Sequence, residues 1–179
     1  MNMKNKFNFL GLILITFLVS CSTSEEEQIK EELTSLGSTQ IGLIDDQRIL
    51  DAESEPGNWL AHGRTYEERR FSPLTGINKE NVSELGLVWS KDMGTNRALE
   101  ATPIVVDGIM FFTSTWSRVY AVDALTGETI WKFDPKVPGE WARKACCDIV
   151  NRGVAVYNGK VYSASLDGRL FAINAETGE

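Results

Sequence analysis

The sequence has little of what metal sites, disulfide scaffolds and nucleic-acid-binding proteins depend on. Its 179 residues include one histidine and three cysteines, which excludes a His-rich metal site, a zinc-type spacing of cysteines and a disulfide-scaffolded miniprotein. His62 has no acidic or Cys partner near it in the sequence, so it is predicted to be a packing or surface residue. Lys and Arg number 18 against 25 Asp and Glu, and the net charge of −7 argues against nucleic acid as a partner.

The negative charge is concentrated before residue 56. Residues 21–55 contain ten acidic and two basic side chains, so the remainder is nearly neutral. An acidic stretch with few aromatic residues is typical of a solvated segment that does not pack. Residues 21–55 are therefore predicted to be an acidic flexible linker.

The N-terminus has the pattern of an export signal. The basic residues Lys4 and Lys6 precede an apolar run over residues 7–19, which is shorter than the roughly 20 residues that a membrane span needs. Residues 1–20 are predicted to be a signal peptide. Leu18-Val19-Ser20-Cys21 resembles a bacterial lipoprotein box, which implies that Cys21 is lipidated and that the protein is a periplasmic, membrane-anchored lipoprotein. An ordinary secretory signal and an uncleaved anchor are the alternative interpretations.

A repeat of 51 residues organises the chain after residue 100. Asp107-Gly108 recurs as Asn158-Gly159, and Thr126-Gly127-Glu128 recurs as Thr177-Gly178-Glu179. Asp-Gly and Asn-Gly between apolar runs predict tight hairpin turns. Strands are predicted over residues 103–106, 109–115, 119–123, 129–133, 154–157, 160–165 and 170–174. Four short antiparallel strands in each repeat of this length are typical of a β-propeller blade.

The predicted fold class is all-β, a β-propeller of four-stranded antiparallel blades over residues 56–179. About two blades are expected, with repeats over about residues 100–150 and from 151 onward, together with part of a closing blade. Trp131 is predicted to lie flat between neighbouring blades. Because a propeller needs at least four blades to close, we expect the chain to be an N-terminal fragment of a longer protein.

Several stretches resemble one enzyme family. The pattern Ala-x-Asp-x-x-Thr-Gly-Glu-x-x-Trp over residues 121–131 resembles the tryptophan docking motif of the pyrroloquinoline quinone (PQQ)-dependent alcohol dehydrogenases, the eight-bladed quinoproteins. Residues 58–74, 100–103 and above all 145–153 resemble further signatures of that family. The resemblance implies oxidation of a small alcohol to an aldehyde in the periplasm, with PQQ, a calcium or lanthanide ion and a cytochrome c-type electron acceptor.

The resemblance also implies a disulfide between Cys146 and Cys147 that forms a flat platform against one face of the quinone. Such a bond closes a strained eight-membered ring and almost no chain loop, so chain entropy gives it no stabilising role. Strain that is kept without a gain in stability is typical of a functional site. Two free buried thiols are the alternative interpretation.

Glu100 and Arg152 are the other candidate cofactor-binding residues. Glu100 precedes Asn151 by 51 residues, so Glu100 and Arg152 are expected to precede the innermost strands of successive blades, at one end of the central channel. The resemblance implies that both contact the polar rim of the quinone, where a guanidinium suits carboxylates. The alternative for Glu100 is a solvated carboxylate, and the alternative for Arg152 is an ion pair between blades. Asp148 and Asn151 are predicted to hold the loop through turn-type hydrogen bonds.

No residue here corresponds to the catalytic base or the metal ligands of the family, which are expected beyond residue 179. Two other functions share some features: a non-enzymatic propeller lipoprotein scaffold of the outer-membrane assembly type, and a quinoprotein sugar dehydrogenase. A scaffold has no use for adjacent cysteines beside Arg152, and sugar dehydrogenases are expected to lack those cysteines. The sequence therefore favours a PQQ-dependent alcohol dehydrogenase, and the fragment alone is expected to be inactive.

Overall fold

The structure is a computed structural model that describes residues 41–145 and 147–179. These residues belong to one compact unit that starts at Gln40. The predicted signal peptide, Cys21, Cys146 and most of the predicted linker lie outside the described residues. Within the described ranges, no helix has both the length and the apolar character needed to cross a membrane.

The first repeat forms a four-stranded antiparallel sheet in the order β1-β2-β3-β4. Its strands are β1 (Ile104–Val106), β2 (Ile109–Thr113), β3 (Val119–Asp123) and β4 (Thr129–Phe133). Asp107 and Gly108 both have positive φ, at 55° and 77°, which is the conformation of a type I′ hairpin turn. Buried and less buried residues alternate along β1 and β2, so one side chain in two points into the core.

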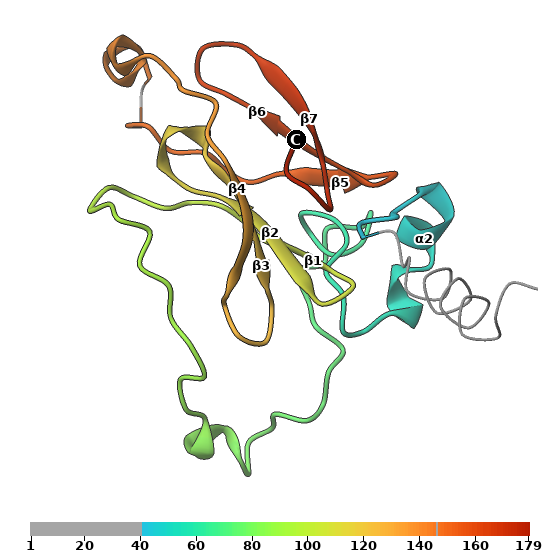
Figure 1. The fold of residues 1–179 in the computed structure, drawn as a ribbon. Coiled ribbons are helices and arrows are strands. Elements are labelled where there is room, and N and C mark those ends of the chain that lie inside the picture. The colour runs from blue at the N-terminus through green and yellow to red at the C-terminus, as the bar shows by residue number, and fades with distance from the viewer. Residues whose placement is uncertain (1–40, 146) are drawn as a thin grey trace, which may run out of the picture. The chain divides into compact units, whose positions relative to one another are not determined.

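The second repeat forms an antiparallel sheet in the order β5-β6-β7. Its strands are β5 (Ala155–Tyr157), β6 (Lys160–Ala164) and β7 (Leu170–Asn174). Its first turn, Asn158-Gly159, again has positive φ at both residues, 47° and 72°. The two sheets (yellow to orange and orange to red in Figure 1) confirm the prediction of an all-β chain built from propeller blades.

Trp131 of β4 joins the two sheets, as the sequence predicted. Its side chain is 8% exposed, and its indole Nε1–H donates to the carbonyl oxygen of Ala175, 2.9 Å away. A Cβ at Gly178 would lie 2.9 Å from the indole ring carbons, so the ring lies directly against the glycine of the second repeat. One hydrophobic core therefore includes residues of both sheets, and burial of this aromatic surface is a main source of their adhesion.

Trp89 makes the equivalent contact with the first sheet. Its Nε1–H donates to the carbonyl oxygen of Ala124 at 3.2 Å, and a Cβ at Gly127 would meet its ring at 2.5 Å. Ala124 and Gly127 precede Ala175 and Gly178 by 51 residues, so Trp89 stands where Trp131 of a preceding blade would stand. That the N-terminal region supplies part of a closing blade stays a prediction, because the stretch that carries Trp89 contains no strand.

Residues 41–55 differ from the flexible linker that the sequence predicted. They contain the short helix α2 (Asp46–Leu50) and the 3-10 helix Ala52–Ser54, and Ile44 and Ala52 are 0% and 2% exposed. The segment also bonds to the hairpin turns of both sheets: the Asn158 N–H donates to the Ile44 carbonyl oxygen at 2.8 Å. The prediction of a linker through residue 55 is therefore wrong for residues 41–55, because Ile44 and Ala52 of this segment are part of the hydrophobic core.

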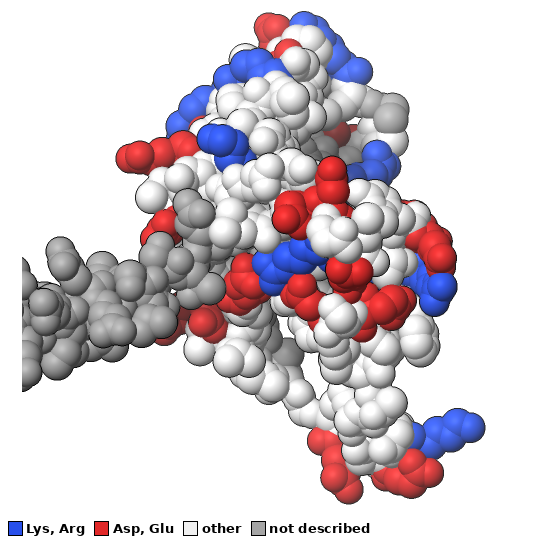
Figure 2. All heavy atoms as spheres, turned by 90° about the vertical axis from the view of Figure 1, so that its right-hand side faces the viewer, with Lys and Arg blue, Asp and Glu red and all other residues white. Residues whose placement is uncertain are grey.

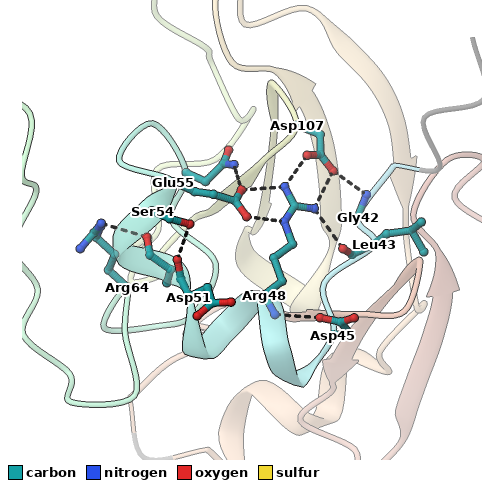
Figure 3. Close-up of polar contacts among 11 residues, drawn as sticks. Gly42, Leu43, Asp45, Arg48, Asp51, Ser54, Glu55, Arg64 and Asp107 are labelled. Carbon is teal, nitrogen blue, oxygen red and sulfur yellow. Dashed lines mark hydrogen bonds and ion pairs between the residues drawn. The ribbon is translucent and has the colours of Figure 1, made fainter. Parts of the chain in front are cut away.

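Arg48 neutralises part of the negative charge in and around this segment. Arg48 pairs with Glu55 at 2.8 Å and with Asp107 at 2.6 Å, and its Nη1 donates to the Leu43 carbonyl oxygen at 3.0 Å (Figure 3). Figure 2 shows acidic side chains gathered around basic ones on the face that carries α2. Arg48 therefore fastens the N-terminal segment to the β1–β2 turn.

The stretch between residues 66 and 102 contains no strand and one 3-10 helix, Val82–Glu84. It runs away from both sheets and returns to them (green in Figure 1). Many of its apolar side chains are exposed, including Phe71, Leu87 and Val88 at 66%, 83% and 86%. Two further 3-10 helices, Thr115–Ser117 and Gly139–Arg143, lie in the loops of the first repeat.

Candidate cofactor site

The segments that precede β1 and β5 run side by side. Thr102 and Gly153 form a parallel bridge, and the Thr102 N–H donates to the Arg152 carbonyl oxygen at 3.2 Å. The two segments occupy the same place in successive repeats, as the 51-residue offset predicted. They therefore bring together, from two blades, side chains that are about 50 residues apart in the sequence.

Glu100 and Arg152 form an ion pair across these segments. The Arg152 Nη2 lies 3.1 Å from the Glu100 Oε2, and their side chains are 70% and 38% exposed. An ion pair between blades was one of the two interpretations of Arg152. Since a guanidinium has five N–H donors and this one is mostly exposed, the pair still leaves donors that face solvent. The structure thus brings the two predicted site residues into contact.

Asn151 holds the turn that carries Arg152. Its Oδ1 accepts from the Gly153 N–H at 3.0 Å and from the Thr113 hydroxyl at 3.0 Å, and its Nδ2 donates to the Ala164 carbonyl oxygen at 2.8 Å. The bond from Gly153 is a turn-type bond of the kind that the sequence suggested. Bonds to both sheets fix the backbone from which the Arg152 side chain extends.

Gly153 is required at this point for a geometric reason. Its φ is +126°, and a Cβ built there would lie 2.8 Å from the Thr102 carbonyl oxygen. Other residues rarely adopt such a φ, and the contact would also push the two segments apart. The close approach that brings Glu100 to Arg152 therefore depends on a residue without a side chain.

The cysteine loop lies immediately before this turn. Cys147 is disulfide-bonded, which excludes two free thiols at this position, while Cys146 lies outside the described residues. Asp148 has a positive φ of 67° and pairs with Arg97. Ile149, which is fully buried, accepts a hydrogen bond from the Trp116 N–H at 3.0 Å. The loop is thus held from the core side at Ile149 and from the solvent side at Asp148.

A hollow of about 470 Å³ opens beside Arg152. It is lined by His62, by backbone and side chains of residues 150–155, and by Ala164, Ser165 and Leu166. Next to it, hydrogen bonds from Arg169 and then from Ser165 lower the pKa of Asp167 to about 2, so this carboxylate is charged at neutral pH. The hollow therefore has a cationic side chain on one wall and a fixed carboxylate behind another.

Within the described ranges, no group of three or more His, Cys, Asp and Glu side chains could hold a metal ion. Sequence reasoning did not identify Arg97, Ser165 or the contact of His62 with the hollow as parts of the site. A signal for Arg97 was present, since it precedes Asp148 by the repeat length of 51 residues and bears the opposite charge. His62 and Ser165 carry no such signal, because they reach the hollow only through the packing of separate segments.

Known proteins share this arrangement of sheets and segments. Residues 59–179 match the family described as PQQ glucose/ethanol/alcohol dehydrogenase, beta-propeller domain. Quinohemoprotein alcohol dehydrogenase ADH-IIG of Pseudomonas putida is 56% identical over 136 residues, which are 76% of this chain and 19% of that protein. The solved structure of that enzyme aligns with a TM-score of 0.77 at 54% identity, over 79% of this chain and 21% of the other.

Two other relatives are named after other alcohols, and one of them also after a metal. The 1-butanol dehydrogenase (cytochrome c) of Thauera butanivorans is 54% identical over 123 residues, 69% of this chain and 18% of that protein. A europium-containing methanol dehydrogenase aligns with a TM-score of 0.70 at 37% identity, over 75% of this chain and 24% of the other. This chain spans about a fifth of the length of these relatives. The family match and these identities lead to one conclusion: the chain belongs to the PQQ-dependent alcohol dehydrogenases, and its two sheets are blades of their β-propeller domain.

Proposed function

We propose that the protein containing this chain oxidises an alcohol to an aldehyde in the periplasm with PQQ, and that these residues form part of the cofactor wall. The observation that carries the proposal is the Glu100–Arg152 pair at 3.1 Å, which joins the segments before the first strands of two blades. Arg152 lies five residues after the disulfide-bonded Cys147. Two relatives that are more than half identical to this chain over the matched residues are named as an alcohol dehydrogenase and a 1-butanol dehydrogenase.

The residues suit the chemistry of the cofactor. PQQ carries carboxylates and quinone oxygens, which are acceptors for a guanidinium such as that of Arg152. Glu100 would accept from the ring N–H of the cofactor, and the disulfide of Cys147, with Cys146 as its proposed partner, would lie against one face of the ring. When bound, PQQ supplies the two-electron acceptor chemistry, while the protein orients it and sets its electrostatic surroundings.

The metal and the electron acceptor extend the same proposal. A calcium or lanthanide ion is proposed for the longer protein, supported by the europium in the name of one structural relative. The cytochrome c in the name of the butanol dehydrogenase supports a cytochrome c-type acceptor. The metal ligands and the catalytic base are proposed to lie beyond residue 179.

The activity is tested by reconstitution of the full-length protein. The apoprotein is mixed with PQQ and Ca²⁺ or a lanthanide, and reduction of an artificial electron acceptor is followed with ethanol, 1-butanol or glucose as the substrate. We expect turnover with a primary alcohol that depends on PQQ. Turnover with glucose alone would favour a sugar dehydrogenase, and absence of both turnover and PQQ binding would favour the non-enzymatic scaffold.

Membrane anchoring is a separate part of the proposal. We propose export by residues 1–20 and lipidation of Cys21, supported by the lipoprotein-like sequence around that residue. In a bacterial host, the wild-type protein should fractionate with membranes and incorporate labelled palmitate, whereas Cys21→Ser should do neither. Equal membrane association of the two proteins, without label, would indicate an uncleaved anchor instead.

A further inference from the structure

Two ion pairs of opposite polarity join the same two segments. Arg97, before β1, pairs with Asp148, before β5. Three residues further along the first segment and four along the second, the charges are reversed, because Glu100 before β1 pairs with Arg152 before β5. Each segment thus offers one cation and one anion to the other, and this crossed pattern fixes their relative register more firmly than two pairs of the same polarity would.

Asp148 links these ion pairs to the disulfide of Cys147. It directly follows Cys147, which is disulfide-bonded, and its φ of 67° is uncommon for a residue with a side chain. A carboxylate held by an arginine favours one orientation of such a residue. The position of the disulfide relative to the Glu100–Arg152 pair is thereby tied to the position of Asp148.

A hydrogen bond within its own loop defines the position of the Arg97 backbone. Its backbone N–H donates to the Thr95 hydroxyl at 3.2 Å, so its starting point is defined by a local turn. The side chains of Arg97 and Asp148 are 48% and 34% exposed. Pairs as exposed as this contribute little to the free energy of unfolding, so the main effect of the contact is on the geometry of the loop.

We infer that Arg97 is a positioning residue of the cofactor site, which holds the disulfide of Cys147 in place through Asp148. The inference rests on the proposed function, since a cofactor stacked on the disulfide would gain from its fixed position. Arg97 is not among the residues that line the hollow beside Arg152. Its effect is transmitted through the side chain of Asp148.

The test measures the disulfide first, without cofactor. In the full-length apoprotein, the rate at which a fixed concentration of dithiothreitol makes Cys147 available for alkylation is followed by mass spectrometry of the peptide. We expect Arg97→Ala and Asp148→Asn to raise this rate by about two- to fivefold, the range that loss of an exposed ion pair allows. The dissociation constant for PQQ, from fluorescence titration, should rise by a similar factor.

The controls separate a change in the position of the disulfide from a general loosening of the structure. Lys144→Ala removes an exposed cation that is also close in sequence to Cys147 but pairs with Glu140 within its own loop, at 3.1 Å, and it should leave both readouts unchanged. The exchange Arg97→Asp with Asp148→Arg should restore the reduction rate to within about twofold of wild type, because it rebuilds the ion pair with reversed charges.

The outcomes distinguish this inference from the proposed function. An unchanged reduction rate in Arg97→Ala overturns the inference, whatever happens to PQQ binding. A faster rate that the charge exchange does not restore also overturns it. If the wild-type protein fails to bind PQQ, the proposed function is wrong, and the reduction rate still decides whether Arg97 holds the loop.

Discussion

Single residues determine how closely the two pre-strand segments approach. Gly153 meets the Thr102 carbonyl oxygen where a Cβ would collide, and Asn151 fixes the adjacent turn with bonds to both sheets. Glu100 and Arg152 then face one another at 3.1 Å. The site is therefore built less by the charged side chains than by the small and amide residues that bring them together.

A substitution that adds one carbon atom at Gly153 tests whether the close approach of the two segments requires glycine there. Gly153→Ala adds a Cβ 2.8 Å from a backbone oxygen, at a φ of +126°, and we expect a loss of about 1–3 kcal/mol in the free energy of unfolding. Denaturant titration of the full-length protein measures it. Gly76→Ala is the matched control, since a Cβ there has nothing within 4 Å, and a loss as small as that of the control would show that Gly153 is not needed.

Arg48 makes stability depend on pH. Its hydrogen bond is the first cause that holds the pKa of Glu55 below its usual 4.5. A carboxyl group whose pKa is lowered by folding stabilises the folded state above its unfolded pKa, and this contribution is lost as pH falls through the folded pKa. Arg48→Ala should therefore cost about 1–3 kcal/mol at pH 7, and the difference from wild type should shrink below about pH 4.5.

The measurement is urea unfolding of both proteins at pH 7 and at a series of lower pH values. Arg69→Ala serves as the control, because that arginine is exposed and pairs with Glu53 and Glu67 on the surface. A difference between Arg48→Ala and wild type that stays constant with pH would contradict the assigned role of Glu55.

At the scale of elements, each blade adheres to the next through a tryptophan and a glycine. Trp131 lies against Gly178, and Trp89 lies against Gly127, with the indole N–H bonded in both cases to the alanine three residues before the glycine. The strands supply the rigid frame, but these contacts determine how one sheet sits on its neighbour. The repeat in the sequence is thus a repeat of interfaces as well as of strands.

Removal of the docking tryptophan Trp131 should lower the free energy of unfolding far more than removal of the half-buried Trp141 in a loop. Trp131→Ala deletes an indole that is 8% exposed and should lower the free energy of unfolding by about 3–5 kcal/mol. Trp141→Ala removes a ring whose centroid lies 4.3 Å from the Lys144 Nζ. It should lower the free energy of unfolding by about 1 kcal/mol or less. Equal losses in denaturant titration would contradict the interface role of Trp131.

The elements were predictable from local pattern, and the segments between them were not. Asp107-Gly108 and Asn158-Gly159 predicted the hairpins, because a type I′ turn requires positive φ at both residues and these residue types adopt it. The linker prediction failed over residues 41–55 because acidic composition was taken as a sign of solvation. Composition alone did not reveal that Arg48 neutralises Glu55 and Asp107, nor that Ile44 enters the core.

At the scale of the whole molecule, the residues of the proposed cofactor site come from two successive blades. Glu100 and Arg152 could be chosen from the sequence because the family resemblance and the repeat pointed to both, whereas the adjacent cysteines were chosen from the resemblance. The pairing of Arg97 with Asp148 was signalled only by their 51-residue offset and opposite charges. The hollow beside Arg152 depends on how two blades pack, which no local pattern encodes. The chain spans about a fifth of the length of its relatives, so we propose that further walls of the cofactor site lie in a longer protein.

The dissociation constant for PQQ tests the central claim most directly. Arg152→Ala removes a guanidinium proposed to bind a carboxylate or quinone oxygen, a contact worth about 1.5–3 kcal/mol. In fluorescence titration of the full-length apoprotein, we predict that PQQ binds Arg152→Ala at least roughly tenfold more weakly than wild type, while Lys144→Ala binds like wild type. Equal PQQ affinity of Arg152→Ala and wild type would contradict the claim that this chain forms a wall of the cofactor site.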